Sequence, residues 1–229
     1  MIAGRLEHVP GSAERGDATR DPHDDLDGDR MLSVERLQRL SFGPFTLGVA
    51  SGECVAVAGP SGSGKSVFLR MIADLDPHVG TAQLDDISRE AVPAPRWRRL
   101  VTYVAAESGW WEDLVAAHFG AAVEPARALL PAVNLPSEAL DWSVARLSSG
   151  ERQRLALVRA LVQEPRALLL DEPTAALDPD ATQAVEALLR RVLERGASIV
   201  LVSHDLRQAD RLATRQFRMA AGQLTARAP

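Results

Sequence analysis

The feature that most constrains this chain is the octapeptide GPSGSGKS at Gly59–Ser66. It follows a short apolar run, Cys54–Ala58, which predicts a strand, and it precedes Val67–Ala73, whose apolar spacing predicts a helix. A glycine-rich turn between a strand and a helix directs backbone N–H groups and the positive end of the helix at an anion. The pattern therefore predicts a loop that holds the β- and γ-phosphates of a nucleotide.

Two residues of this loop have separate predicted tasks. Lys65 is the single lysine among the 26 basic residues, and a compact ammonium suits a crowded phosphate site better than the planar fork of arginine. The hydroxyl of Ser66 is the predicted Mg²⁺ ligand. We expect the whole loop and the next residue to contact ATP, namely Gly59, Pro60, Ser61, Gly62, Ser63, Gly64, Lys65, Ser66 and Val67.

Charge is distributed unevenly along the 229 residues. Residues 1–30 hold eight acids and four arginines with few large apolar side chains, which predicts a disordered acidic tail. Of the net charge of −5, this tail carries −4, so the remainder of the chain is nearly neutral. That balance gives no broad basic footprint, and no nucleic-acid partner is expected.

Hydrophobic content limits the other classes of protein. A hydrophobic fraction of 46% is ordinary for one main globular domain, which we place at residues 31–225. No apolar run reaches the roughly 18–20 residues that span a bilayer, and the N-terminus lacks the apolar core of a signal peptide. The lone Cys54 indicates a small core residue in a reducing compartment.

The order of the predicted elements indicates the fold class. Apolar residues alternate in 32–37 and in 45–49, which predicts an antiparallel β flap, and a short strand is expected at 82–84. Prolines near likely helix starts predict a helical subdomain at about 108–147. Later strands alternate with helices, so we expect the α/β fold of a phosphate-loop NTPase, with a mostly parallel sheet flanked by helices. The predicted later strands are Val101–Val104, Ala167–Leu170 and Ser198–Val202.

Polar residues follow two of these strands. Asp171 and Glu172 end the strand Ala167–Leu170, and His204 follows Ser198–Val202. Ligands of open parallel sheets bind at the carboxyl ends of strands, so these side chains should face the phosphate loop. Asp171 suits the Mg²⁺ shell, Glu172 can polarise a water, and His204 can contact the γ-phosphate. The alternative is that acids end strands simply to meet solvent.

A second anion site is predicted at the start of another helix. The stretch LSSGERQR at Leu147–Arg154 opens a helix whose apolar residues Leu155, Val158 and Leu161 fall on one face. Ser and Gly at a helix start leave backbone N–H groups available to an anion.

Together these motifs resemble the ATP-binding cassette family over about residues 31–225. The ordered motifs are GPSGSGKS, LSSGE, LLLDEP, ALD and the late His204. The resemblance implies an ATPase subunit of a transporter, with Lys65, Glu172 and His204 catalytic. It also implies a head-to-tail dimer, either a homodimer or a pair with a related subunit, in which Ser148 and Gly150 close the ATP site of the other chain.

The same resemblance implies a place in the cell. The membrane-spanning transporter subunit would be a separate chain, and this subunit would lie in the cytoplasm on the inner face of the membrane through that partner. Trp110 and Trp111 would face the partner, although core packing is the alternative for these aromatics. Asp178 would lie in a loop that links the two ATP sites.

Several positions depart from the family pattern. Ala106 replaces the usual glutamine, and Ser149 and Glu151 replace a glycine and a glutamine of the LSGGQ signature. No tyrosine is available in the first strands to stack on adenine, so Phe42 is the candidate. The departures at Ala106, Ser149 and Glu151 leave open a regulatory ATP-binding module with little hydrolysis. A separate alternative is a soluble family member in DNA repair or translation.

Overall fold

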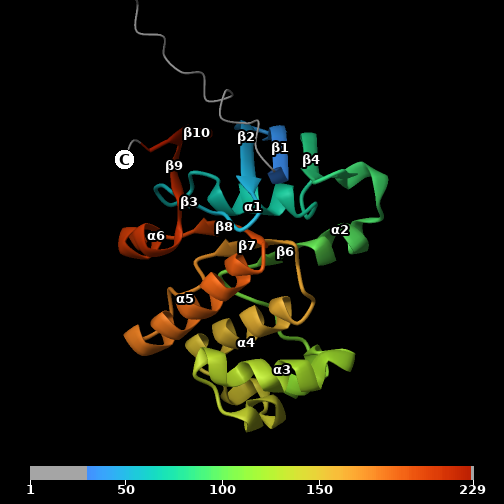
Figure 1. Cartoon of the computed structure of the whole chain (residues 1–229), viewed down its shortest axis with the longest axis vertical. Helices are drawn as coiled ribbons and strands as arrows, with labels where there is room; N and C mark the ends of the chain where they lie inside the picture. The colour runs from blue at the N-terminus through green and yellow to red at the C-terminus, as the bar shows by residue number, and fades with distance from the viewer. Residues whose placement is uncertain (1–29, 228–229) are drawn as a thin grey trace, which may run out of the picture.

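The computed structural model describes residues 30–227, which form two sheets with helices around them (Figure 1). The predicted acidic tail lies outside the described residues, apart from Arg30, which begins the first strand. Within residues 30–227, no helix combines the length and the apolar composition that a bilayer crossing requires.

The larger sheet has six strands and is mostly parallel, as predicted. Strands β9, β3, β8, β7 and β6 run parallel, and only the pairing of β10 with β9 is antiparallel. The sequence patterns did not predict β9 and β10. In spatial order the strands are β10 (Gln223–Ala226), β9 (Arg215–Ala220), β3 (Cys54–Ala58), β8 (Ser198–Val202), β7 (Ala167–Asp171) and β6 (Val101–Val104).

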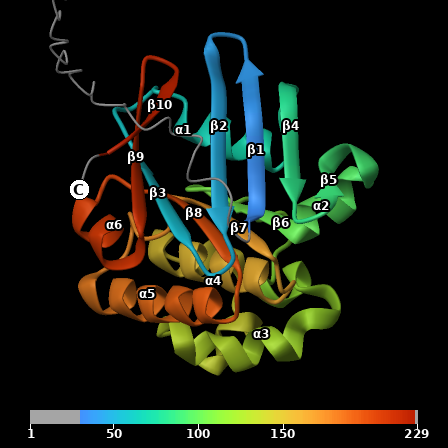
Figure 2. The ribbon, with the colours of Figure 1, turned by 45° about the horizontal axis from the view of Figure 1, so that its top comes forward.

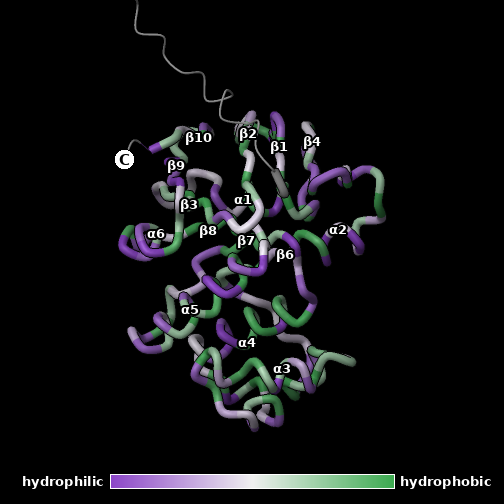
Figure 3. The backbone as a smooth tube through the Cα atoms, viewed as in Figure 1, coloured by the Kyte–Doolittle hydropathy of each residue, from purple (hydrophilic) through white to green (hydrophobic). Residues whose placement is uncertain are grey.

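The central strands are buried on both faces because their side chains alternate between two hydrophobic clusters. On one face lie α4 (Ser149–Leu161), α5 (Pro179–Glu194) and the helical subdomain; on the other lie α1 (Lys65–Ile72) and the smaller sheet. Figure 3 shows the contrast between hydrophobic β7 and β8 and the largely hydrophilic α6 (Leu206–Leu212). Leu168, Leu170, Ile199 and Leu201 belong to the first cluster, and Leu169, Val200 and Val202 to the second.

The smaller sheet is the predicted antiparallel flap. Figure 2 shows β2 (Phe42–Ala50), β1 (Arg30–Arg39) and β4 (Val79–Leu84) side by side, and β5 (Ile87–Ser88) pairs with the outer edge of β4. Strand β4 begins before the predicted 82–84 because its pairing with β1 extends to Gln38 and Val79.

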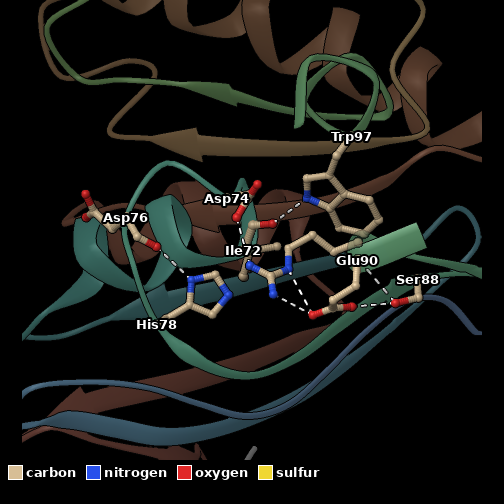
Figure 4. Close-up of polar contacts among 8 residues, drawn as sticks. Ile72, Asp74, Asp76, His78, Ser88, Glu90 and Trp97 are labelled. Carbon is tan, nitrogen blue, oxygen red and sulfur yellow. Dashed lines mark hydrogen bonds and ion pairs between the residues drawn. The ribbon is translucent and has the colours of Figure 1, made fainter. Parts of the chain in front are cut away.

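A polar network fastens the end of α1 to the flap and to α2 (Ala94–Leu100) (Figure 4). The buried Trp97 donates from Nε1 to the carbonyl of Ile72 at 2.9 Å. Arg89 bridges Asp74 at 2.8 Å and Glu90 at 2.5 Å. These contacts hold the far end of α1 in place, so that its start is presented at a defined position.

The predicted helical subdomain contains one short α-helix, α3 (Val123–Leu129), among several 3₁₀ helices. Its prolines lie close to helix starts: Pro125 is the third residue of α3, Pro131 is in the first turn of the next 3₁₀ helix, and Pro136 caps another. Short turns with prolines cannot form long α-helices, because proline lacks the backbone donor.

Candidate functional site

The phosphate loop joins β3 to α1 through backbone conformations that favour glycine. Gly62 and Gly64 have φ of 76° and 101°, in the left-handed region. Gly59 lies so close to β9 that a Cβ would come within 2.1 Å of the carbonyl oxygen of Met219. No side chain caps α1 at Gly64, so its first backbone N–H groups remain available to an anion.

Lys65 is buried at the start of α1, with 7% of its surface exposed. Its Nζ donates to the carbonyl oxygens of Gly59 at 2.7 Å and Pro60 at 3.0 Å. The loop therefore curls around its own ammonium group. This arrangement places one compact positive charge inside the glycine turn.

The two serines of the loop differ in exposure. The Oγ of Ser63 is buried and has no hydrogen-bond partner within the described chain. Ser66, at the second position of α1, is exposed. A buried hydroxyl without a partner is costly unless a ligand satisfies it, so Ser63 fits a site that binds a phosphate oxygen.

Asp171 ends β7 and is buried, and its Oδ2 accepts a hydrogen bond from the hydroxyl of Tyr103 at 2.9 Å. Burial, together with the neighbouring Asp171 carboxylate, raises the pKa of Tyr103, so the phenol remains a donor. The sequence patterns did not identify Tyr103, because its position opposite Leu169 of β7 becomes visible only in the paired strands.

Glu172 follows Asp171 and adopts φ of 51°, which is unusual for a residue other than glycine. Its Oε1 lies 3.2 Å from Nε2 of His204, and its Oε2 accepts from the backbone N–H of His204 at 3.2 Å. Burial raises the Glu172 pKa, although the His204 contacts and Lys65 oppose the rise. His204 itself is largely exposed.

The structure brings four of the predicted residues together at the carboxyl edge of adjacent strands. The phosphate loop follows β3, His204 follows β8, and the acidic pair ends β7, and these three strands are neighbours. Lys65 and Asp171 both lie close enough to Glu172 to influence its pKa. The site thus combines one buried ammonium, two carboxylates and an imidazole around the glycine turn.

Ser148 and Gly150 lie elsewhere, at the start of α4 on the opposite face of the sheet from α1. Ser148 and Glu151 form a capping box, in which Glu151 Oε2 accepts from the backbone N–H of Ser148 at 2.8 Å. Gly150 packs against the loop after β7, because a Cβ there would be 2.8 Å from the carbonyl oxygen of Ala176. Asp178 caps α5 by accepting from Ala181 N at 2.8 Å.

The remaining residues named in the sequence analysis differ in how far they are buried. The ring of Phe42 lies against the phosphate loop, since a Cβ on Gly64 would be 2.5 Å from its Cδ1. Trp111 is 70% exposed, whereas Trp110 packs against the core cluster. Ala106, in place of the usual glutamine, is exposed after β6.

Comparisons with known proteins agree with this geometry. The family model described as ABC transporter matches residues 42–175. Aliphatic sulfonates import ATP-binding protein SsuB 2 of Mesorhizobium japonicum is 37% identical over 209 residues, covering 86% of this chain and 80% of the relative. Thiamine import ATP-binding protein ThiQ of Escherichia coli is 37% identical over 193 residues, covering 79% and 82%.

Solved structures of ATP-binding cassette proteins also resemble this chain. A dimeric structure of the ATP-binding cassette MJ0796, in a post-hydrolysis state bound to ADP and Pi, aligns with a TM-score of 0.74 and 25% identity. The alignment covers 87% of this chain and all of that one. The predicted fold class, a phosphate-loop NTPase with a flap and a helical subdomain, is confirmed.

Proposed function

The chain belongs to the ABC transporter family as an ATP-binding and ATP-hydrolysing subunit, and from this premise we propose that it works as a head-to-tail dimer and drives import through a separate membrane-spanning partner. The import direction is supported by the names of relatives that serve sulfonate and thiamine import. These names favour transport over a role in DNA repair or translation.

The observation that carries the proposal is the division of the site between two surfaces. Lys65 and Glu172 lie at the carboxyl edge of the sheet, whereas α4 and Ser148 lie on the face opposite α1. One chain therefore presents a phosphate loop at one place and the start of α4 at another. A second copy, or a related subunit, would supply Ser148 and Gly150 to the phosphate loop of this chain.

The chemistry of hydrolysis follows from the residues at that edge. We assign Lys65 and the loop N–H groups to the β- and γ-phosphates, where positive charge stabilises the transition state. Glu172 orients a water and takes up its proton as the water attacks the γ-phosphorus and the bond to the β-phosphate oxygen breaks. His204, beside Glu172, is assigned a γ-phosphate contact.

Mg²⁺ fits the oxygen donors that the loop and β7 present. The Ser66 hydroxyl is exposed at the start of α1, and Asp171 offers a buried carboxylate with one oxygen engaged by Tyr103. When bound, the ion supplies charge neutralisation on the phosphate oxygens. Ser66 and Asp171 are its proposed ligands.

The membrane partner is proposed to contact the helical subdomain beside Trp111. This exposed indole stacks under Arg159, whose Cζ lies 5.2 Å from the ring centroid, and exposed aromatic and arginine side chains are enriched at protein interfaces. Such a partner would hold the subunit at the inner face of the membrane.

The test of this function is the Glu172→Gln substitution. The amide keeps the size of the carboxylate but cannot take up a proton, so we expect steady-state hydrolysis to fall by at least about 100-fold. ATP binding should persist, and the variant should accumulate as an ATP-bound dimer in size-exclusion chromatography.

The control is Glu194→Gln, which removes an exposed carboxylate at the end of α5. Equal turnover by wild type and Glu172→Gln would remove Glu172 from the role of base. If wild type and Glu172→Gln both elute as monomers in the presence of ATP, the proposed dimer is refuted. Purified wild type that binds ATP with no turnover beside its membrane partner would favour a regulatory module instead.

A further inference from the structure

Gln153 is a buried polar side chain on α4 that contacts the loop after β7 at two points. Only 7% of Gln153 is exposed. Its Nε2 donates to the carbonyl oxygen of Glu172 at 2.5 Å, and its Oε1 accepts from the backbone N–H of Ala176 at 3.3 Å. One side chain therefore joins the helix that carries Ser148 to both ends of the segment 172–176.

The contact with Glu172 acts on a strained residue. Glu172 has φ of 51°, a conformation that is unfavourable for a residue with a side chain and persists only where the surrounding structure holds it. Its backbone N–H donates to Val202 on β8 at 2.9 Å, and its carbonyl is held by Gln153. Together these bonds fix the peptide units on both sides of the Glu172 Cα, and hence the direction of its side chain.

Backbone packing makes the connection stiff. The Cα of Gly150 leaves no space for a side chain, because a Cβ would lie 2.8 Å from the carbonyl oxygen of Ala176. The first turn of α4 therefore cannot move toward this loop without displacing Ala176. On the other side, Gln208 of α6 is fully buried and donates to the Thr174 hydroxyl at 2.8 Å, so the loop is held from two helices.

We propose that Gln153 is a positioning residue that couples the start of α4 to Glu172 of the same chain. This inference rests on the proposed function, in which the start of α4 meets the ATP held by the partner chain. ATP bound at that surface displaces the first turn of α4, and Gln153 transmits the displacement to the Glu172 carbonyl. Closure on one ATP thus aligns the base that acts on the other.

The first experiment measures kcat and KM for Gln153→Met and Gln153→Glu. Methionine has nearly the volume of glutamine but no hydrogen-bonding groups, and glutamate keeps an acceptor for Ala176 while losing the donor to Glu172. We expect kcat to fall about 10- to 100-fold in both, with KM and the affinity for a fluorescent ATP analogue within about twofold of wild type. A merely structural role would change nucleotide affinity and thermal stability together with kcat.

The matched control is Gln163→Met with Gln163→Glu. Gln163 follows α4 and is exposed, and within residues 30–227 its side chain hydrogen-bonds only to the Arg159 carbonyl of the preceding helix. Wild-type kcat in these controls is expected. Wild-type kcat in both Gln153 variants, in a preparation where Glu172→Gln abolishes turnover, overturns the inference and leaves the proposed function intact; unchanged turnover in Glu172→Gln refutes the proposed function instead.

A second measurement needs no turnover. In the Glu172→Gln protein, amide hydrogen exchange is followed in the segments 149–153 and 172–177 with and without ATP. The inference predicts that ATP slows exchange in both segments together, and that adding Gln153→Met leaves only 149–153 slowed. Protection of 149–153 alone in the Glu172→Gln protein, or equal protection of 172–177 in both proteins, overturns it.

Discussion

Glycine and serine residues lie at the starts of both α1 and α4, yet the first turns of these helices are completed in different ways. Helix α1 starts after Gly64 in a left-handed conformation with no side-chain cap. Helix α4 starts after Ser148, whose Oγ accepts from Glu151 N at 3.2 Å, while the Glu151 carboxylate accepts from Ser148 N and Oγ at 2.8 Å. The first N–H groups of α1 are therefore free of side-chain caps, whereas the first turn of α4 is capped by Ser148 and Glu151.

The difference teaches that the two predicted anion sites are not equivalent. The start of α1 combines free N–H groups with the buried Lys65, so it forms a phosphate site within one chain. At α4 a carboxylate already occupies part of the positive end of the helix. Within residues 30–227, the start of α4 has no buried cation like Lys65. A phosphate bound there therefore needs positive charge from another surface.

Among these variants, Lys65→Ala should have the largest effect, because it removes the cation that distinguishes the start of α1 from that of α4. Removing the one ammonium inside the loop eliminates charge-assisted hydrogen bonds of about 1.5–3 kcal/mol each, so ATP affinity should fall by about 100-fold or more. Equilibrium binding of a fluorescent ATP analogue measures this. Lys65→Arg is the companion variant: the planar fork does not fit where Nζ lies between two carbonyls, so it should rescue little. Unchanged affinity in Lys65→Ala would discredit the loop assignment.

Gly64→Ala should have an intermediate effect, on protein stability, because it adds a side chain at the start of α1 where none fits. The new Cβ would lie 2.5 Å from Phe42 Cδ1, and the alanine would have to adopt the φ of 101° that Gly64 has. We therefore expect the free energy of unfolding to fall by about 2–3 kcal/mol. Chemical denaturation measures the loss. Gly120→Ala separates the two causes, since Gly120 has φ of 54° but no neighbour within 4 Å of a Cβ. An equal loss in both variants would exclude the clash with Phe42.

Glu151→Gln should have the smallest effect and sharpens the comparison at α4. The amide keeps an acceptor for Ser148 N but removes the negative charge, so stability should fall by about 0.3–1 kcal/mol while ATP-driven dimerisation becomes a few-fold tighter. The backbone hydrogen bond from Ser148 lowers the pKa of Glu151. The carboxylate's contribution is therefore complete above its ordinary pKa of 4.5 and is lost as the pH falls through the lowered value.

Denaturation of wild type and Glu151→Gln as a function of pH tests that assignment. The difference in stability between them should stay constant at neutral pH and shrink in acid. Glu35→Gln, an exposed charge removal on β1, serves as the control. A dimer no tighter in Glu151→Gln than in Glu35→Gln would show that the α4 carboxylate does not compete with the phosphate.

Local patterns predicted much of the fold and the residues of one site. The phosphate loop needs a strand, a glycine turn and a helix in immediate succession, so its place was readable from Gly59–Ser66 alone. Strands β3, β6, β7 and β8 are buried on both faces and read as short apolar runs. Strand β9 contains three polar residues among six and β10 is a short strand at the sheet edge, so no apolar run marks them.

The residues that the sequence patterns did not identify act through partners far away along the chain. Gln153 has one weak signal, since it shares the buried stripe of α4 with Leu157 and Ala160 and is polar there. Tyr103 and Gln208 carry no such mark, because the groups that they contact, the carboxylate of Asp171 and the hydroxyl of Thr174, are 68 and 34 positions distant.

By itself the sequence determined which groups are available: one lysine in a glycine loop, an acidic pair at a strand tip, and a serine and a glycine at a helix start. Only the tertiary structure decided which of them meet. The order of β3, β8 and β7 brings Lys65, Glu172 and His204 to one edge and leaves Ser148 on another face. The physical reason is that local periodicity is set by neighbours along the chain, whereas strand order and hydrogen bonds between helices depend on contacts that close long loops.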